Sequence, residues 1–241
     1  MRRDTGPDFE PSHVAALFDR NALTYDRINT VITLGLDAAW RRWAARQAAP
    51  LDRLTPPRVL DACAGTGLLA RDLARRGATV TAVDAAPRML EVARARLGAA
   101  GLAARVVVGD LADPATAAGL GGPFDAVTLG FGLRYFADPG ALLRPLRGLL
   151  RPGGRLVVVE AVRPPGDLPG VAAGLYFNEV APRVGAALAG SAELYEFLTA
   201  STRALGSADE VAAHLRGARF GIALRRRFAC GVVAGFVAAP V

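Results

Sequence analysis

The apolar residues of this chain gather into short runs separated by longer amphipathic stretches. Runs rich in Val, Leu and Ala predict strands near residues 58–62, 79–84, 105–109, 124–130 and 155–161. The stretches between these runs predict helices near residues 68–76, 87–98 and 139–150. Strands that alternate with helices in this way are typical of a parallel sheet covered by helices on both faces.

The end of the chain departs from this alternation. A helix is expected near residues 208–217, and two apolar runs at 222–227 and 229–237 follow it, joined almost directly. Strands joined so tightly are antiparallel neighbours. The pattern therefore predicts an α/β fold with a Rossmann-like, seven-stranded sheet whose last strand is antiparallel, rather than the six-stranded sheet of dinucleotide-binding domains.

Two segments lie outside the pattern. Residues 11–50 are helical and precede the first strand, and residues 164–206 interrupt the path to the last helix. Ligands of open α/β sheets bind outside the carboxyl ends of the strands, an edge that both segments can reach. Either segment alone could equally well be a set of additional core helices. Two such segments that flank the same ligand site favour a lid over the substrate. We expect an N-terminal helical arm at 1–50 and a ligand-binding domain at 51–241 that contains the 164–206 lid.

The end of the first strand carries the pattern of a nucleoside site. Residues 59–67 read Val-Leu-Asp-Ala-Cys-Ala-Gly-Thr-Gly and open a helix, while Asp84 ends the second strand. Glycine lets a ligand approach the backbone, and a helix N-terminus offers unpaired N–H groups. A carboxylate at the end of the second strand can accept the two hydroxyls of a ribose.

Two cofactors compete for this site. The run Gly65-Thr66-Gly67-Leu68-Leu69-Ala70 fits the dinucleotide pattern G-x-G-x-x-G/A, with Asp84 at the expected distance. Asp61 favours S-adenosylmethionine instead, because a carboxylate there suits an ammonium group and repels a pyrophosphate. Asp110 follows the third strand, where it can accept the adenine amino group. Acids at the ends of three successive strands favour the cationic sulfonium cofactor and a methyltransferase, although each acid alone is commonly a helix cap.

Composition narrows the class of protein. The chain has 241 residues, is 52% hydrophobic and carries a formal charge of +7, with arginine as its only strongly basic residue. The arginines are scattered and lack interleaved aromatic residues, which argues against nucleic acid as a partner. No stretch approaches the roughly 18 charge-free apolar residues of a membrane span. The start, Met1-Arg2-Arg3-Asp4, lacks the apolar region of a signal peptide. We expect a cytoplasmic protein. Weak peripheral association with the inner face of the membrane and formation of a homodimer are left open.

The residues suited to metal or thiol chemistry are sparse. Cys63 and Cys230 are expected to be free thiols. His13 and His214 are the only histidines, and they have no cysteine cluster or acid pair beside them. We therefore expect no metal site.

Longer motifs resemble the C-methyltransferase family of ubiquinone and menaquinone biosynthesis, from about residue 14 to the end. The N-terminal signature contains Phe18-Asp19, Tyr25-Asp26, Asn29, Gly35 and Trp40-Arg41-Arg42. The loop after the fourth strand reads Gly130-Phe131-Gly132-Leu133-Arg134, and Arg151-Pro152-Gly153-Gly154-Arg155 and Glu160 follow. The insertion contributes Tyr176, Pro182-Arg183-Val184-Gly185, Tyr195, Leu198 and Ser201, and Gly231-Val232-Val233-Ala234 closes the pattern.

The sequence also departs from the family on the substrate side. Tyr135 stands where the family usually has the asparagine of an Arg-Asn pair, thought to organise proton removal from the substrate. Ala200 replaces a glutamate, and Gly235-Phe236 follows Ala234 where a histidine is usual. We therefore expect a divergent member with an altered acceptor.

The resemblance implies methylation of a carbon on a demethylmenaquinol-like quinol or a related phenol. A natural-product C- or O-methyltransferase and a non-methylating relative are the alternatives. Arg134 is the expected catalytic residue, stabilising a phenolate or orienting a water, with a structural ion pair as the alternative; Tyr135 is its expected partner. The residues expected around the cofactor are Tyr25, Asp61, Ala62, Cys63, Gly65, Gly67, Asp84, Ala85, Met89, Gly109, Asp110, Leu111 and Gly130. The residues expected around the substrate are Phe131, Glu160, Tyr176 and Tyr195, with Glu160 facing the cavity because an unpaired buried carboxylate is costly.

Overall fold

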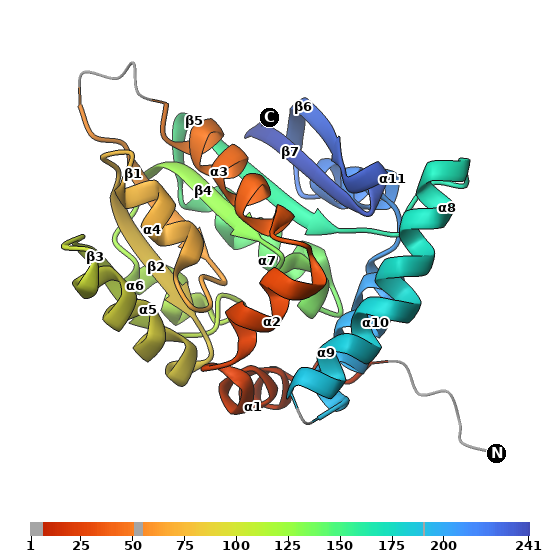
Figure 1. Ribbon diagram of the computed structural model, residues 1–241. Coiled ribbons are helices and arrows are strands. Elements are labelled where there is room, and N and C mark those ends of the chain that lie inside the picture. Colours follow the sequence, from red (N-terminus) through yellow and green to blue (C-terminus); the bar gives the residue numbers. More distant parts are fainter. Residues whose placement is uncertain (1–6, 51–54, 190) are drawn as a thin grey trace.

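The fold is built on one mixed sheet of seven strands in the order β3-β2-β1-β4-β5-β7-β6 (Figure 1). The computed structural model describes residues 7–50, 55–189 and 191–241, so the polar start at 1–4 lies outside the described residues. The strands are β1 Arg58–Ala62, β2 Thr79–Asp84, β3 Ala104–Val108, β4 Phe124–Gly130, β5 Leu150–Ala161, β6 Phe220–Phe228 and β7 Val233–Pro240.

Strand β1 lies at the centre of the parallel part, paired with β2 on one side and β4 on the other. Strand β7 runs antiparallel to both β5 and β6. The predicted sheet with an antiparallel last strand is thus confirmed. Strand β5 begins five residues earlier than expected, because Leu150 pairs with Phe124 across an irregularity in the ladder.

Helices cover both faces of the sheet. Their bounds are α1 Pro11–Asn21, α2 Tyr25–Ile32, α3 Leu36–Ala48, α4 Leu68–Ala74, α5 Pro87–Ala99, α6 Pro114–Gly119, α7 Pro139–Gly148, α8 Leu168–Leu175, α9 Ala181–Ala189, α10 Glu193–Leu205 and α11 Ala208–Gly217. Helices α3 and α4 bury Trp43 and Leu73 against one face, and α7 and α11 bury Leu142 and Val211 against the other.

Helix α3 belongs to the core of the sheet domain. Trp40, Trp43 and Ala44 are buried in the same cluster as Val59, Ala126 and other strand residues. Of the segment expected as an arm, α1 and α2 lie over the carboxyl edge of the strands, and α3 reaches that edge with Asp37, Trp40 and Arg41. The short helix α6 and a π-helix at Tyr176–Val180, between α8 and α9, were not predicted.

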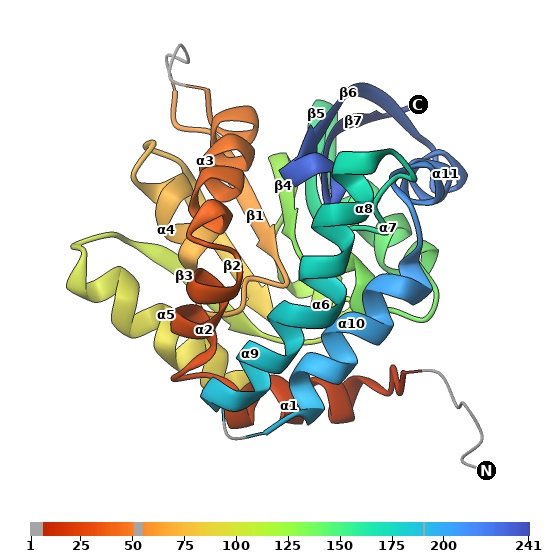
Figure 2. The ribbon, with the colours of Figure 1, turned by 45° about the vertical axis from the view of Figure 1, so that its right-hand side comes forward.

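The two segments outside the sheet meet over its carboxyl edge. Leu17 and Ile28 of α1 and α2 share a buried cluster with Leu194 and Phe197 of α10. Figure 2 shows α9 and α10 running side by side there, with α1 below them. This contact is the packing basis for the lid, which remains a prediction as far as its motion is concerned. Among the described helices, none is long and apolar enough to cross a membrane.

Substitution of Gly67 tests how tightly α4 packs on α5. Gly67 has φ +75°, and a Cβ built there lies 2.7 Å from the Cβ of Ala93. Gly67→Ala should therefore lower the free energy of unfolding by about 2–4 kcal/mol, through left-handed strain and overpacking. Gly77→Ala is the matched control, because Gly77 has φ +80° and open space around its Cβ position. Urea unfolding of both variants measures the difference, and equal losses would show that the contact with Ala93 relaxes freely.

Candidate active site

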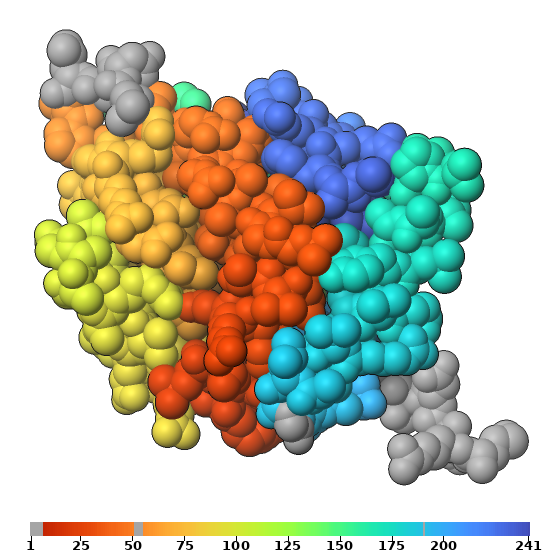
Figure 3. All heavy atoms as spheres, in the orientation of Figure 1, coloured from red at the N-terminus to blue at the C-terminus, as the bar shows by residue number. Residues whose placement is uncertain are grey.

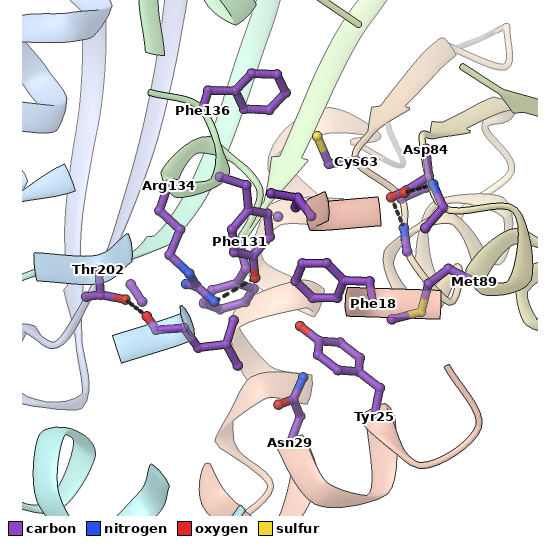
Figure 4. Close-up of a pocket in the computed structure, with 18 of the residues that line it drawn as sticks. Phe18, Tyr25, Asn29, Cys63, Asp84, Met89, Phe131, Arg134, Phe136 and Thr202 are labelled. Atoms are coloured by element: carbon purple, nitrogen blue, oxygen red, sulfur yellow. Dashed lines mark hydrogen bonds between the residues drawn. The ribbon is translucent and has the colours of Figure 1, made fainter. Parts of the chain in front are cut away.

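A cavity of about 450 Å³ opens at the carboxyl ends of β1, β2, β4 and β5, beneath α1, α2, α9 and α10. This volume lies within the usual range for cofactor and substrate sites. In Figure 4, Asp84 and Met89 lie on one side of the cavity and Arg134 and Thr202 on the other, with Phe18 and Tyr25 between them. The cavity therefore has two halves with different chemistry.

The first half is formed by the glycine loop after β1. The loop is held by Asp84, whose carboxylate accepts hydrogen bonds from the backbone N–H of Gly65 at 2.8 Å and of Ala86 at 2.9 Å. Each oxygen keeps a lone pair for a ligand hydroxyl. Cys63 and Gly65 both adopt φ +53°, which turns the chain sharply around the cavity. Burial raises the pKa of the Cys63 thiol well above its usual value, which favours the neutral thiol over the thiolate.

Asp61 supplies an incompletely paired charge to this half. Its side chain is 1% exposed, and Oδ1 accepts a hydrogen bond from the Thr128 hydroxyl at 2.7 Å. Oδ2 is buried without a hydrogen-bond partner among the described residues. Burial raises the pKa of Asp61 to about 7. Asp61 lines the cavity, and a buried carboxylate that is not fully hydrogen-bonded fits a cationic ligand group and does not fit a pyrophosphate.

The end of β3 completes the cofactor half. Asp110 Oδ1 accepts a hydrogen bond from the backbone N–H of Ala112 at 2.9 Å, which fixes the turn. Gly109, Asp110 and Leu111 all line the cavity. The three acids predicted from the strand ends are thus brought to one wall.

The N-terminal helices are fastened to this wall by two acids whose role the sequence reasoning missed. Asp19 accepts hydrogen bonds from the backbone N–H groups of Arg88 at 2.9 Å and Met89 at 3.3 Å, capping α5. Asp26 accepts a hydrogen bond from the Thr66 hydroxyl at 2.6 Å and pairs with Arg96. The sequence shows both acids only as parts of a signature, because the partner of a capping carboxylate lies far away along the chain and leaves no local pattern.

The second half is centred on a buried ion pair. Arg134 NH1 lies 2.8 Å from Glu160 Oε1, and the two side chains are 7% and 0% exposed. Glu160 also accepts backbone hydrogen bonds from Leu133 and Ala161, each at 2.8 Å. Glu160 therefore lies behind Arg134 and does not face the cavity, so the expectation that it contacts substrate is wrong. Burying the Glu160 carboxylate without a partner would be costly, and Arg134 supplies that partner in place of a ligand.

Aromatic rings enclose the exposed side of this arginine. Arg134 NH2 donates to the Tyr135 hydroxyl at 2.9 Å. The Tyr135 ring lies 4.8 Å from the ring centre of Phe18 and 5.7 Å from that of Phe197. Burial raises the pKa of Tyr135 well above its usual value and also raises that of Tyr25. Although burial alone would lower it, the neighbouring Tyr135, Glu160 and Tyr25 raise the pKa of Arg134, which is a permanent cation.

The two tyrosines of the lid have different environments. Tyr195 is 2% exposed and lines the cavity, and its hydroxyl has no hydrogen-bond partner among the described residues. Tyr176 does not line the cavity, because its hydroxyl points to α2 and donates to the carbonyl of Ile32 at 3.1 Å. The placement of Tyr176 at the substrate is therefore corrected to a contact between lid and arm.

Most of the expected site residues are brought together. Those that line the cavity are Tyr25, Asp61, Cys63, Gly65, Asp84, Ala85, Met89, Gly109, Asp110, Leu111, Gly130, Phe131, Arg134, Tyr135 and Tyr195. Ala62, Gly67, Glu160 and Tyr176 do not line it. Ala62 is a buried strand residue, and Gly67 is required for the close approach of α4 to α5.

A further ion pair at the cavity was not predicted. Asp37 and Arg41 of α3 line the cavity, with Arg41 NH1 2.5 Å from Asp37 Oδ2. The Arg41 Nε is buried without a hydrogen-bond partner among the described residues. The sequence contains Arg41 in the Trp40-Arg41-Arg42 run of the family signature, but such a run does not indicate which side chain points into the cavity. Neither histidine lines the cavity, and no metal-binding cluster of His, Cys, Asp or Glu occurs in the described ranges.

Comparisons with known proteins agree with this geometry. A family model described as the ubiE/COQ5 methyltransferase family matches residues 8–239. The demethylmenaquinone methyltransferase of Clavibacter sepedonicus is 37% identical over 97% of this chain and 92% of its own length. That of Deinococcus radiodurans is 40% identical over 86% and 84%. The magnesium protoporphyrin IX methyltransferase of Synechocystis PCC 6803, solved with bound SAH, shares the fold with a TM-score of 0.64, at 17% identity over 97% and 100%.

The raised pKa of Asp61 predicts how cofactor binding depends on pH. A cationic ligand group requires the ionised carboxylate, so binding below a pKa of about 7 must release a proton. The affinity for S-adenosylmethionine should rise by roughly tenfold from pH 5.5 to pH 7 and then level off.

Asp61→Asn is the matched variant, because asparagine keeps the shape and cannot ionise. It should bind more weakly and lose this part of the pH dependence, while any contribution of Asp84 remains in both proteins. Calorimetric titration at several pH values measures both effects. A slope that is unchanged in Asp61→Asn would assign the titration to another group.

Proposed function

The chain belongs to the ubiE/COQ5 methyltransferase family, and from this premise we propose that it methylates a ring carbon of a demethylmenaquinol-like quinol. It is an S-adenosylmethionine-dependent methyltransferase with a Rossmann-like fold. The names of its relatives support the quinol acceptor. A prenylated quinol resides in a lipid bilayer, so the proposal also requires the enzyme to reach a membrane surface.

The observation that carries the proposal is the division of the cavity between an unpaired anion and a fixed cation. Asp61 presents a buried free oxygen in the first half, and Arg134 presents its guanidinium in the second. A cationic donor and an acceptor that becomes anionic have complementary charge to these two halves. The aromatic walls suit a planar ring.

The cofactor residues have separate proposed tasks. Asp61 would hold the ammonium group, Asp84 the ribose hydroxyls and Asp110 the adenine amino group. Bound S-adenosylmethionine supplies an electrophilic methyl group on a sulfonium. The chain itself must hold the acceptor carbon in line with that methyl, about 3–3.5 Å away, and exclude water. Phe18, Tyr25 and Tyr195 line the space where such a ring would lie.

Arg134 is proposed to stabilise the phenolate form of the acceptor. A phenolate donates electron density to its ring and makes the neighbouring carbon nucleophilic. Arg134 cannot remove the phenol proton, because it stays protonated, and no histidine lines the cavity in the described part of the chain. We propose that the proton leaves to a water molecule, because the guanidinium stabilises the phenolate that remains and so lowers the pKa of the phenol. Glu160 holds the guanidinium in position from behind.

Tyr135 supports a second candidate function, methylation of a different phenol at carbon or oxygen. Its ring fills the space between Phe18 and Phe197, and its hydroxyl occupies one donor of Arg134. An asparagine there would leave more room. The acceptor that fits beside Tyr135 is therefore proposed to be smaller or differently substituted than the family's ordinary quinol.

Arg134→Ala tests the cation. It should lower turnover by on the order of 100-fold or more, while affinity for S-adenosylmethionine stays nearly unchanged. The variant leaves Glu160 buried and unpaired, which costs about 3–5 kcal/mol of stability.

The double variant Arg134→Ala/Glu160→Gln removes that unpaired charge and should recover stability without recovering turnover. Thermal unfolding and steady-state kinetics of both proteins separate the two effects. Full turnover in the double variant would leave Arg134 a purely structural residue.

Tyr135→Asn tests the acceptor. It should shift preference toward a demethylmenaquinol-like quinol and away from small soluble phenols, without loss of cofactor binding. Tyr135→Phe is the matched control, because it removes the hydroxyl but keeps the ring; if space decides, its preference should resemble that of the wild type. Release of S-adenosylhomocysteine with each acceptor measures the preference, and an identical acceptor profile in all three proteins would contradict a role for Tyr135 in selection.

A further inference from the structure

The outer face of the lid helices is apolar where a surface helix is normally polar. Six large aliphatic residues are exposed there: Leu168, Val171, Leu175, Val180, Val184 and Leu188. Leu168 is 83% exposed, Leu175 60% and Leu188 54%. Between Leu168 at the start of α8 and Ala189 at the end of α9, the only charged residues are Glu179 and Arg183, which pair with each other at 3.0 Å. We call the six aliphatic residues the lid stripe.

The π-helix keeps the lid stripe continuous. Its residues are spaced by three or four positions, except for the step of five from Leu175 to Val180, which spans the π-helix Tyr176–Val180. A π-turn carries about one residue more than an α-turn, so both ends of that step fall on the same face. A regular α-helix would turn Val180, Val184 and Leu188 away from Leu168 and Leu175. The irregularity therefore preserves one long apolar face.

The opposite face of the same segment closes the active-site cavity. Phe177, Asn178, Ala181 and Pro182 line the cavity wall. The segment is thus a single layer between the proposed acceptor and the outside. Tyr176 joins this layer to α2 through its hydrogen bond to Ile32.

A second exposed strip lies beside the lid stripe. Helix α2 packs against α9, and in Figure 3 the two segments form neighbouring parts of one surface. Leu23, Val31 and Leu34, on and around α2, are exposed, as is Arg27 between them. Among the described residues Arg27 has no ion-pair partner. This face therefore combines aliphatic side chains with an unneutralised positive charge.

We infer that the lid stripe and the α2 strip dock on an anionic lipid bilayer, which delivers the acceptor to the cavity directly beneath. The choice of lipid rests in part on the proposed function. It rests also on the unpaired Arg27 and the net charge of +7, which attract anionic headgroups. A second copy of the chain fits less well. The lid stripe, roughly 30 Å long, and the α2 strip, roughly 18 Å long, are each one helix wide and together cover on the order of 500 Å², whereas a stable interface needs about 800 Å² per partner.

Vesicle sedimentation tests this docking. The wild-type protein should sediment with vesicles of phosphatidylcholine containing 30% phosphatidylglycerol, and more weakly with pure phosphatidylcholine. Leu175→Gln/Leu188→Gln should lower the bound fraction at least fivefold. The control Leu224→Gln/Val241→Gln changes two exposed aliphatic residues on and after the terminal hairpin and should bind like the wild type. Arg27→Gln should reduce the preference for anionic vesicles.

Two further measurements separate this inference from the proposed function. Methyl transfer to a soluble quinol without a prenyl chain should be the same in the stripe variant as in the wild type, and only transfer to a vesicle-embedded quinol should fall. Vesicle binding without methylation of any quinol would support the docking and contradict the proposed acceptor. Equal vesicle binding by wild type and stripe variant would overturn the docking. So would a wild-type dimer in analytical ultracentrifugation that Leu175→Gln/Leu188→Gln dissociates, because the stripe would then seat a second copy.

Discussion

The carboxylate of Glu160 at the end of β5 is the interaction on which the second half of the site depends. It accepts backbone hydrogen bonds from the loop after β4 and from its own strand, and it pairs with Arg134. Taking both charges out of water is costly, so the geometry must be held closely by these bonds. As a result one buried anion sets the path of the loop, the direction of the arginine and, through Arg134, the position of Tyr135.

The first half of the site is also held by acids, which lie on the sheet and on the N-terminal helices. Asp84 fixes the glycine loop from the end of β2, and Asp26 of α2 bonds Thr66 in the same loop. Asp19 of α1 caps α5 beside the loop. The arm is therefore bonded to the elements that would contact the cofactor, while α9 and α10 close the acceptor side.

Sequence reasoning worked where a residue's role follows from its own strand or turn. The ends of the strands, the three acids at their tips and the sharp turn after β1 follow from local pattern, because parallel strands bring their carboxyl ends to one edge. It failed where a side chain's direction depends on a distant partner. Glu160 turned inward to Arg134 and Tyr176 turned to the Ile32 carbonyl, so neither faces the cavity. Helix α3 joined the core because Trp40 and Trp43 pack on the sheet, which no local signal in residues 1–50 indicates.

The sequence by itself determined the seven-stranded sheet, the cofactor edge and the family, since hydrophobic period, glycine spacing and long motifs are local properties. Tertiary structure alone decided that one buried oxygen of Asp61 has no hydrogen-bond partner, and that Arg134 is a cation held in place by Glu160. It also decided that the lid has two apolar faces. Each of these depends on which groups lie opposite one another after folding. Burial, and with it the pKa of a carboxylate or the exposure of a leucine, is a property of the packed chain and not of the residue.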